Sequence, residues 1–349
     1  MMPMFTAVLG TPSPIAHWTL HVVRTAMEIL DGEHALIHSD TLEEFRSERH
    51  RLHAGAKGTV LFATAPAATL GNLLARAKAP IIAANDTAPD VVSFAVGALG
   101  MSTEIAMREY LKSKATQNSV LHAPSSIQVS SAAYALPFRV YLEDLTRCCP
   151  LDIDRALLDA ITTAVVGQHP AGDSAPVGDL IVRDIKGAEK PGQYSVLDAD
   201  SLALVDRLGS QFESILAGDR RSNLRCPQTL YIADGAIYGL ADRWRPLLGP
   251  KRCFLWGPYI HLPKGQWFVR ARIAVRENRS GNKLRVEVLR AISLHRAIEA
   301  LLPAEGVFEF EMEFEVVEPR DPIEVTFTIL EGAIEGAFRL VDIGFHRQF

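Results

Sequence analysis

The side chains best suited to binding an anion lie at two turns in the first hundred residues. An apolar segment, residues 5–9, runs into the first turn, and residues 80–84 run into the second. In an open parallel sheet, ligands bind beyond the carboxyl ends of the strands, so the first strand–helix turn is the place to look for a site. Backbone amide, hydroxyl, side-chain amide and imidazole groups at the two turns could hold a phosphate or sulfate. The candidates are Gly10, Thr11, His17, Asn85 and Ser93.

The segments around these turns alternate between two hydrophobic periods. Residues 5–9, 59–63, 80–84 and 138–142 are short apolar runs typical of buried strands. Helical spacing is found in residues 17–30, 68–78, 89–111 and 153–166. This alternation predicts an α/β domain with a parallel sheet and helices on both faces. Residues 167–193 are rich in Gly, Pro and Asp and predict a long surface loop, and a helix over 200–216 closes this first domain, residues 1–220.

The first turn resembles the opening motif of sulfotransferases, Gly-Thr-Pro-Arg-Ser-Gly-Thr-Thr-Trp. This chain reads Gly10-Thr11-Pro12-Ser13-Pro14-Ile15-Ala16-His17-Trp18. The resemblance implies a P-loop-like fold in which the turn wraps the 5′-phosphosulfate of the donor, adenosine 3′-phosphate 5′-phosphosulfate. Four residues match, but Ser13 replaces the family's Arg, Ala16 and His17 replace its Thr pair, and Pro14 removes a backbone N–H. The frame of the motif is kept, whereas its phosphate-binding side chains are absent.

Residues 60–66 resemble the segment in which sulfotransferases carry Lys-Thr-His. In the family, the Lys lies near the transferring sulfuryl group and the His acts as general base. Ala63 and Ala65 stand at these two positions. Because alanine can neither accept a proton nor stabilise a bridging oxygen, the comparison predicts that the catalytic residues are absent.

Residues 81–93 resemble the family's 3′-phosphate motif, in which an Arg and a Ser eight residues later hold that phosphate. Asn85 replaces the Arg, and Ser93 matches at the same spacing. An asparagine offers hydrogen bonds but neither the charge nor the bidentate geometry of arginine. The resemblance therefore implies a vestigial nucleotide site. Residual binding of the donor or of its spent product, adenosine 3′,5′-bisphosphate, is left open, and no other cofactor is expected.

Residues 140–145 resemble the family's Tyr-Glu-Asp-Leu strand end, which is mostly structural. Adjacent residues of a strand point to opposite faces, so Glu143 and Asp144 are not expected to form a catalytic pair. The resemblance to sulfotransferases covers roughly the first two-thirds of the chain.

After Arg225 the hydrophobic period changes to two, which predicts an antiparallel β-sandwich, jelly-roll-like, over residues 225–349. One strand has its apolar side chains at Trp267, Val269, Ala271, Ile273 and Val275. A second, residues 308–316, sets apolar residues against Glu309, Glu311, Glu313 and Glu315. Residues 323–329 repeat the alternation, and a helix is predicted near residues 293–302.

Residues 256–267 resemble a segment of carbohydrate-binding-like sandwich modules, which carry Gly-Pro-Tyr followed by Leu-Pro-x-Gly before a core strand. Trp256 and Tyr259 could stack on sugar rings, and His261 or Lys264 could donate to hydroxyl groups. The simpler interpretation is that Trp267 begins a core strand and that the proline and glycine form a turn. Such modules often accompany bacterial enzymes of surface glycans, so the resemblance implies a glycan ligand.

The composition excludes several function classes. The chain has 349 residues, 48% hydrophobic and 22% charged, with a formal net charge of −5, which argues against nucleic acid as the main partner. The cysteines Cys148, Cys149, Cys226 and Cys253 show neither a metal-binding spacing nor a disulfide framework, so reduced thiols are expected. The first residues lack the pattern of a signal peptide, and no apolar run approaches a membrane span. A cytoplasmic protein without membrane insertion is therefore expected.

Two further groups of residues have simpler explanations than a site. His50 and His53 lie three apart on a charged helix with no evident third metal ligand, so a solvated face is the preferred interpretation. The four glutamates of residues 309–315 could bind cations, but the exposed face of a sheet also explains them. No metal site is predicted.

Three functional hypotheses follow. The first is a non-catalytic binding or regulatory protein of bacterial surface-polysaccharide production, whose partner is a glycan or another protein of that pathway. The second is a divergent sulfotransferase or other glycan-modifying transferase, with the missing groups supplied elsewhere, for instance by Arg220, Arg221 or Arg225. The third is a structural subunit of an assembly.

Overall fold

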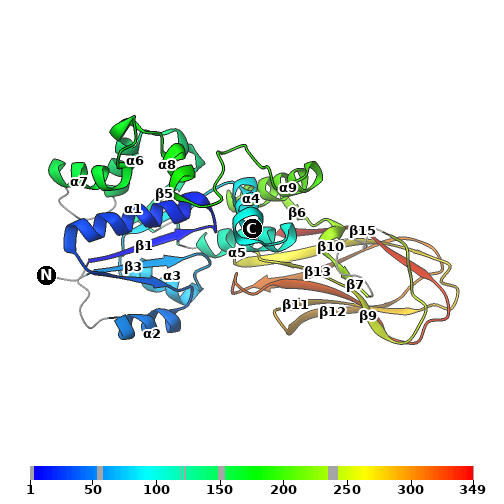
Figure 1. Cartoon of the computed structure of the whole chain (residues 1–349). Helices are drawn as coiled ribbons and strands as arrows, with labels where there is room; N and C mark the ends of the chain where they lie inside the picture. Colours follow the sequence, from blue (N-terminus) through cyan, green and yellow to red (C-terminus); the bar gives the residue numbers. More distant parts are fainter. Residues whose placement is uncertain are drawn as a thin grey trace. The chain divides into compact units, whose positions relative to one another are not determined.

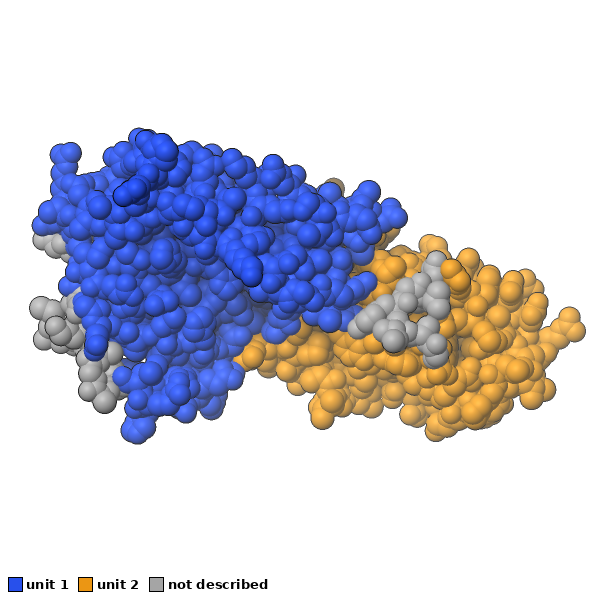
Figure 2. Space-filling model, viewed as in Figure 1, with its two compact units in different colours: residues 1–206 blue, residues 207–349 orange. Residues whose placement is uncertain are grey.

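A computed structural model describes residues 4–52, 58–118, 120–121, 123–147, 154–234 and 243–348. The chain divides into two compact units, residues 1–206 and 207–349, which Figure 2 shows in different colours. The boundary falls within helix α9, Ala199–Leu216.

The first unit contains a parallel sheet with helices packed on it (Figure 1). Its strands are β1 (Met4–Gly10), β2 (His34–His38), β3 (Gly58–Ala63), β4 (Ile81–Asn85) and β5 (Ser126–Ser130). They lie in the order β2-β3-β1-β4-β5, with every neighbouring pair parallel. The predicted α/β class is therefore confirmed, although the sequence analysis did not anticipate β2 and β5.

Each face of the sheet is covered by its own set of helices. One apolar cluster joins the sheet to α1 (Pro14–Asp31), α6 (Phe138–Thr146), α7 (Arg155–Val166) and α8 (Val177–Asp184). A second cluster on the opposite face includes side chains of α2 (Leu42–Leu52) and α3 (Ala68–Arg76). The central strands are buried on both faces, which explains their unbroken apolar runs.

The predicted strand over residues 138–142 is wrong, because these residues begin helix α6. The buried side chains are Phe138, Tyr141, Leu142 and Leu145, which is the i, i+3, i+4, i+7 spacing of one helix face. Glu143 and Asp144 are therefore neighbours on a helix, and the expectation that they point to opposite faces of a strand does not apply.

Two other predicted boundaries differ from the structure. The helical stretch over residues 89–111 is two helices, α4 (Ala88–Leu99) and α5 (Thr103–Gln117), because Gly100 adopts a φ of 70° and ends α4. The predicted loop over residues 167–193 contains helix α8, whose Leu180 and Ile181 are fully buried. A short helix with a narrow apolar stripe gives little signal among glycines and prolines.

The second unit consists of two antiparallel sheets, which confirms the predicted sandwich class. The first has the order β13-β10-β15-β6, and the second has the order β12-β11-β14-β9-β7. The long strands are β9 (Arg252–Ile260), β10 (Gly265–Arg276), β11 (Lys283–Arg290), β12 (Ser293–Leu301), β13 (Gly306–Val316), β14 (Ile323–Ile329) and β15 (Ala337–Arg347). The short ones are β6 (Asn223–Arg225), β7 (Ile232–Ala233) and β8 (Arg245–Pro246). Phe327 packs against Phe310 and Phe338 in the core between the sheets.

The helix predicted near residues 293–302 is wrong, because residues 293–301 form strand β12 at the edge of its sheet. Leu294, Ile298 and Leu301 have helical spacing, which favours a helix when the sequence is read alone. The segment instead pairs with β11 and remains largely exposed, and its apolar residues do not form a buried stripe. Charged side chains on an exposed edge strand discourage pairing with other chains.

Some predictions fall on residues that the structure does not describe, namely those for Cys148, Cys149, His53 and residue 153. Cys226 and Cys253 are free thiols. Among the described residues, no cluster of three or more His, Cys, Asp and Glu side chains is placed to hold a metal ion. Within the same residues, no helix combines the length and apolarity needed to cross a membrane.

Candidate functional site

The candidate site of the first unit lies where β3, β1 and β4 end side by side. Leu9 of β1 is opposite Ala63 of β3, and Gly10 is opposite Ala84 of β4. The turns that follow these strands therefore meet at one edge of the sheet, where α/β proteins bind ligands. Which groups at this edge are available to a ligand can be judged by following the hydrogen bonds of each turn.

At the first turn, the donors at the start of α1 are already bonded within the chain. The Ser13 side chain caps the helix and accepts a hydrogen bond from the Ala16 amide at 3.4 Å. The Thr11 hydroxyl donates to Ser13 Oγ at 3.3 Å, and both side chains are fully buried. Pro14 has no N–H to offer. The first turn of a helix is the usual source of amides for an anion, and here it is largely committed.

The carboxyl group of Asp86 faces this same turn. Asp86 directly follows β4, is only 3% exposed, and accepts a hydrogen bond from the Tyr134 hydroxyl to Oδ2 at 3.2 Å. The Ser13 hydroxyl and the Ile15 amide also favour the ionised carboxyl, although Oδ1 meets no donor at hydrogen-bond geometry among the described residues. A carboxylate of the chain itself thus lies against the donors with which this turn could bind an anion.

Burial raises the pKa of Asp86 to about 7, and the charge of Asp90 acts in the same direction. These two effects outweigh the hydrogen bonds from Ser13, Tyr134 and Ile15, which lower the pKa. Burial, followed by the charges of Asp86 and Asp90, also raises the pKa of the Tyr134 hydroxyl. Near neutral pH, Asp86 therefore exchanges between its neutral and ionised forms, while Tyr134 keeps its proton and remains a donor.

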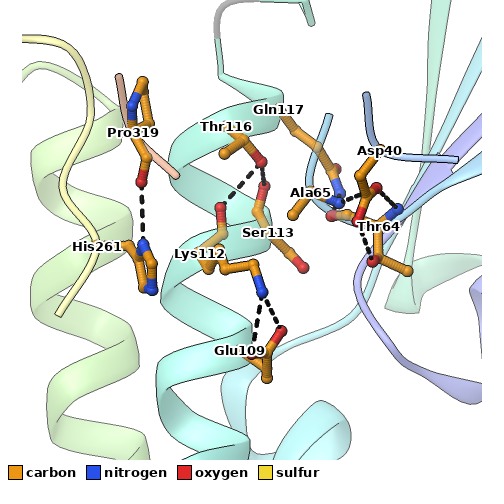
Figure 3. Close-up of polar contacts among 10 residues, drawn as sticks. All are labelled: Asp40, Thr64, Ala65, Glu109, Lys112, Ser113, Thr116, Gln117, His261 and Pro319. Atoms are coloured by element: carbon orange, nitrogen blue, oxygen red, sulfur yellow. Dashed lines mark hydrogen bonds and ion pairs between the residues drawn. The ribbon is translucent and has the colours of Figure 1, made fainter. Parts of the chain in front are cut away.

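A second carboxylate, that of Asp40, occupies the turn after β3 (Figure 3). Its Oδ1 accepts hydrogen bonds from the amides of Thr64 and Ala65, both at 2.8 Å, and Oδ2 accepts from the Thr64 hydroxyl at 3.4 Å. On the other side of the turn, the Gln117 side-chain amide donates to the Thr64 carbonyl oxygen at 3.0 Å. The two consecutive amides that could bind an oxyanion are therefore bound to Asp40.

A third carboxylate, that of Glu189, contacts helix α4, which follows the turn after β4. The Ser93 hydroxyl donates to Glu189 Oε2 at 3.5 Å, and the Ser195 amide donates to the same oxygen at 3.2 Å. The hollow beside these residues has a volume of only about 10 Å³, which is about the room that one water molecule requires. Lys190 also lines this hollow, but its ammonium group is paired with Asp179 at 2.9 Å.

The other predicted residues of this edge have packing roles or remain unsatisfied. A Cβ atom on Gly10 would lie 2.4 Å from the Cβ of Ala16 and 2.9 Å from the Ala84 carbonyl oxygen, so the glycine is required where α1 crosses the sheet. His17 packs between the rings of Phe62 and Phe94, at 5.6 and 5.8 Å, and burial followed by His38 lowers its pKa.

Asn85 has a buried Oδ1 with no hydrogen-bond partner among the described residues. This oxygen is an acceptor, which a phosphate cannot satisfy without a proton of its own. The Asn85 side chain can still donate through its amide nitrogen, but it lacks the positive charge with which an arginine binds a phosphate.

The residues present do not fit the phosphosulfate donor that the resemblance implies. Phosphate groups are held by free amides and by cations. At this edge the donors of two turns already contact Asp86 and Asp40, and Ser93 of α4 contacts Glu189, so an incoming phosphate would meet carboxylates. Ala63 and Ala65 are 2% and 0% exposed, so these positions offer neither a base nor access. We therefore derive no transfer step from this edge of the sheet.

The candidate site of the second unit is the outer face of the sheet β12-β11-β14-β9-β7. Trp256 is opposite Thr326 of β14 and Ile232 of β7, and directly opposed residues of antiparallel strands share a face. Phe327, the next residue along, points into the core, so Thr326 and Trp256 point away from it. Trp256 is partly exposed on this face.

Tyr259 reaches the same outer face. Its hydroxyl donates to Glu324 Oε1 at 2.9 Å, and Glu324 lies between the two core residues of β14 that flank it. The backbone of Tyr259 has a φ of 58°, a conformation that costs a non-glycine residue about 1–2 kcal/mol. Burial raises the pKa of Glu324. The packing therefore holds Tyr259 in place at an energetic cost.

Polar side chains complete the surface between these two aromatic rings and the sheet edge. Thr326 is only 6% exposed and its hydroxyl donates to Glu287 at 3.3 Å, while Arg285 contacts Glu299 at 2.5 Å. Two partly exposed aromatic rings beside carboxylate and guanidinium groups form a surface on which sugar rings can stack and sugar hydroxyls can bond.

The remaining predicted residues of this segment lie elsewhere. His261 is 7% exposed, and its Nδ1 lies 3.1 Å from the Pro319 carbonyl oxygen (Figure 3). The Trp267 indole is fully buried and donates to the Pro263 carbonyl oxygen at 3.0 Å. The structure thus brings Trp256 and Tyr259 to one face of the sheet, whereas His261 is held within the fold.

No protein-family model and no curated protein matches the chain. The mouse sulfotransferase SULT7A1 complexed with PAP is similar over 47% of this chain and 63% of its own, with 11% identity and a TM-score of 0.36. The xylan-binding module CBM15 is similar over 36% of this chain and 95% of its own, with 10% identity and a TM-score of 0.28. The module TmCBM61, in complex with β-1,4-galactotriose, is similar over 29% and 67%, with 21% identity and a TM-score of 0.23. The structural neighbours thus include a sulfotransferase and several carbohydrate-binding modules, and function must be argued from the side chains.

Sequence reasoning missed the carboxylates that determine the state of the first site. Asp86 lies within the segment compared with the 3′-phosphate motif, and its adjacency to Asn85 was the available signal. Asp40 and Glu189 lie 24 and 96 residues from the groups they bind, and no local pattern connects such pairs.

Proposed function

We propose that this chain is a non-catalytic, glycan-binding protein of surface-polysaccharide production, in which the first unit keeps a sulfotransferase-like frame without a donor site. The observation that carries the first half of this proposal is that Asp86 and Asp40 lie against the donors of the turns after β1 and β3, while Glu189 accepts from Ser93 of α4. Each carboxylate keeps nearby polar groups hydrogen-bonded, which removes the penalty of leaving them bare. These polar groups therefore have hydrogen-bond partners within the unit and need no nucleotide to supply them.

The glycan-binding half of the proposal is supported by the placement of Trp256 and Tyr259 on one outer sheet face. Aromatic rings supply contact area to the apolar faces of sugars, and the polar groups of Thr326 and Glu287 lie between them and the sheet edge. The link to polysaccharide production comes from the resemblance of residues 256–267 to modules that accompany such enzymes.

The donor site is tested by thermal unfolding of the whole chain with millimolar adenosine 3′-phosphate 5′-phosphosulfate or adenosine 3′,5′-bisphosphate. We expect no change in midpoint, because a phosphate would have to displace a bound carboxylate. A ligand at a hundred times its Kd would add about 2.7 kcal/mol to the unfolding free energy. An active sulfotransferase measured under the same conditions gives the rise in midpoint that donor binding produces. A clear rise in midpoint, with turnover of labelled donor, would make the chain a divergent transferase instead.

The glycan surface is tested by replacing Trp256 with alanine and measuring binding to a panel of soluble polysaccharides, including xylan and β-glucans, by affinity electrophoresis. A central aromatic residue of a binding surface contributes at least about 2 kcal/mol, so affinity should fall by about thirtyfold or more. Trp244→Ala is the matched control, because this tryptophan lies under the Arg276 guanidinium at 4.4 Å and has no part in the proposed surface. Equal losses in both variants, or no binding by the unaltered chain, would reject the surface.

A further inference from the structure

The outer face of the other sheet, β13-β10-β15-β6, contains a polar hollow with a volume of about 180 Å³. It is lined by Asn223, Arg225, Arg270, Arg272, Glu309, Asp342, Gly344 and His346. Pockets for drug-sized ligands are larger, about 300–1,000 Å³, so this hollow suits a group about the size of one sugar residue. It lies on the sheet opposite to the one that carries Trp256 and Tyr259.

The hollow exists because Gly344 has no side chain. Gly344 of β15 is opposite Arg225 of β6 on one side and Arg270 of β10 on the other. A Cβ atom at Gly344 would meet nothing closer than His346 Nε2 at 3.5 Å, and its backbone has no positive φ that would demand glycine. Neither the backbone conformation nor the surrounding atoms require a glycine at this position. Its effect on the structure is to leave space between Arg225 and Arg270 at the bottom of the hollow.

The arginines around the hollow differ in whether their guanidinium groups already contact a carboxylate. Arg270 is bonded to Glu311 at 2.8 Å and lies 3.4 Å from Glu309. Within the described part of the chain, the guanidinium groups of Arg225 and Arg272 make no ion pair or hydrogen bond, and Asp342 makes none either. With Glu311, which is bonded to Arg270, three arginines and three carboxylates surround the hollow, and Arg225 and Arg272 are the arginines left to receive an anion. An exposed pair of uncommitted guanidinium groups can receive an oxyanion with two parallel hydrogen bonds each.

The remaining lining groups can bind hydroxyls. His346 is stacked on Phe268 with ring centroids 4.7 Å apart, and burial followed by Arg270 lowers its pKa, so the ring is a neutral donor or acceptor. The Asn223 amide and the Asp342 carboxylate add a donor and acceptors. Guanidinium groups beside neutral and acidic side chains suit a ligand that carries one anionic group and several hydroxyls.

We infer that the hollow over Gly344 binds an acidic sugar residue, with Arg225 and Arg272 holding its oxyanion and Asn223, His346 and Asp342 contacting its hydroxyls. The inference rests on the proposed role of the second unit in glycan binding and adds the charge of the ligand to it. The oxyanion can be the carboxylate of a uronate or the sulfate of a sulfated sugar. The shared chemistry is an oxyanion group on a pyranose ring.

The test is calorimetric titration of the whole chain with short oligosaccharides of glucuronate, matched neutral oligosaccharides, glucose 6-sulfate, acetate and inorganic sulfate. The acidic oligosaccharide should bind, and its affinity should fall at least about tenfold in Arg225→Ala, because this variant removes a charge-assisted contact to the oxyanion. Gly344→Val, which fills the floor, should lose binding equally, and Gly344→Ala should lose part of it. Unchanged thermal midpoints would show that the variants fold.

Two control variants distinguish this site from the surface around Trp256. Trp256 and Arg285 belong to the other sheet. The variants Trp256→Ala and Arg285→Ala should therefore leave binding of the acidic oligosaccharide unchanged. If these two variants lose it while Arg225→Ala does not, the acidic sugar binds the other face and the inference is overturned. Absence of binding to any acidic sugar, or equal binding of acetate and sulfate, would also overturn it. Neutral glycans that depend on Trp256 alone would leave the proposed function standing without this inference.

Discussion

Replacing Asp86 by asparagine should remove a decline in unfolding free energy of about 4 kcal/mol that the unaltered chain undergoes as the pH rises from about 4 to about 7. The pKa of Asp86 is raised from 3.8 to about 7 in the folded state. Between these values the folded chain holds a proton that the unfolded chain has released, so stability falls as pH rises and levels off above about 7. Across this window the unfolding free energy changes by about 1.4 kcal/mol for each pH unit.

This change is measurable by chemical denaturation at several values between about pH 5 and pH 7, where about 2.5 kcal/mol of the difference should develop. Asparagine cannot ionise, so its curve should lack this component while keeping an acceptor for Tyr134. Asp173→Asn is the matched control, because Asp173 is exposed and its replacement should leave the slope intact. Parallel pH profiles for Asp86→Asn and the unaltered chain would show that the carboxyl is not buried as described.

A buried carboxyl is tolerated at this turn because Asp86 can form hydrogen bonds in both its neutral and its ionised form. A neutral Asp86 can itself donate a hydrogen bond, and an ionised one accepts from Tyr134 and is favoured by Ser13 and Ile15. In either form it gives the turn a polar partner of the chain's own. An apolar residue would leave the Tyr134 hydroxyl, which is buried, without an acceptor.

The sequence was informative wherever one period governed a whole element. The alternation in β10 and β13 followed from burial on one face, and the apolar runs of β1, β3 and β4 followed from burial on two. It was misleading where a short segment fitted two periods. Phe138 and Leu142 suited a strand until Tyr141 and Leu145 showed a helix face, and β12 had helical spacing but edge-strand pairing.

For the candidate site too, features set by local sequence could be predicted and features set by tertiary contacts could not. Local motifs located the turns and marked the side chains that differ from the sulfotransferase pattern. They could not reveal the carboxylates that contact the donors near these turns, because Asp40 and Glu189 reach Thr64 and Ser93 through tertiary structure. On the second unit, the hollow over Gly344 depends on three strands far apart in sequence, so no local pattern could predict it.

Replacing Asp40 by alanine should lower the unfolding free energy by about 3 kcal/mol and should make the chain responsive to sulfate. The variant leaves the amides of Thr64 and Ala65 without the carboxylate that they contact at 2.8 Å. A hydrogen bond to a charged group contributes about 1.5–3 kcal/mol, and partial burial adds to the penalty of unpaired amides. Two adjacent amides at a strand end are, once freed, a site for an oxyanion.

The measurement is chemical denaturation of both chains in tens of millimolar sulfate, with sodium chloride at equal ionic strength as the reference. Sulfate stabilises proteins in general by exclusion from their surface, so only a larger gain in Asp40→Ala than in the unaltered chain counts as rescue. Asp159→Ala, which removes an exposed partner of Arg139, provides a variant that loses a carboxylate without freeing turn amides. A selective gain in Asp40→Ala would mean that the turn can still bind an oxyanion and that the chain's own carboxylate excludes one. Equal gains in all three chains would mean that this turn does not bind sulfate even without the carboxylate, and the proposed absence of a donor site would then need no contribution from Asp40.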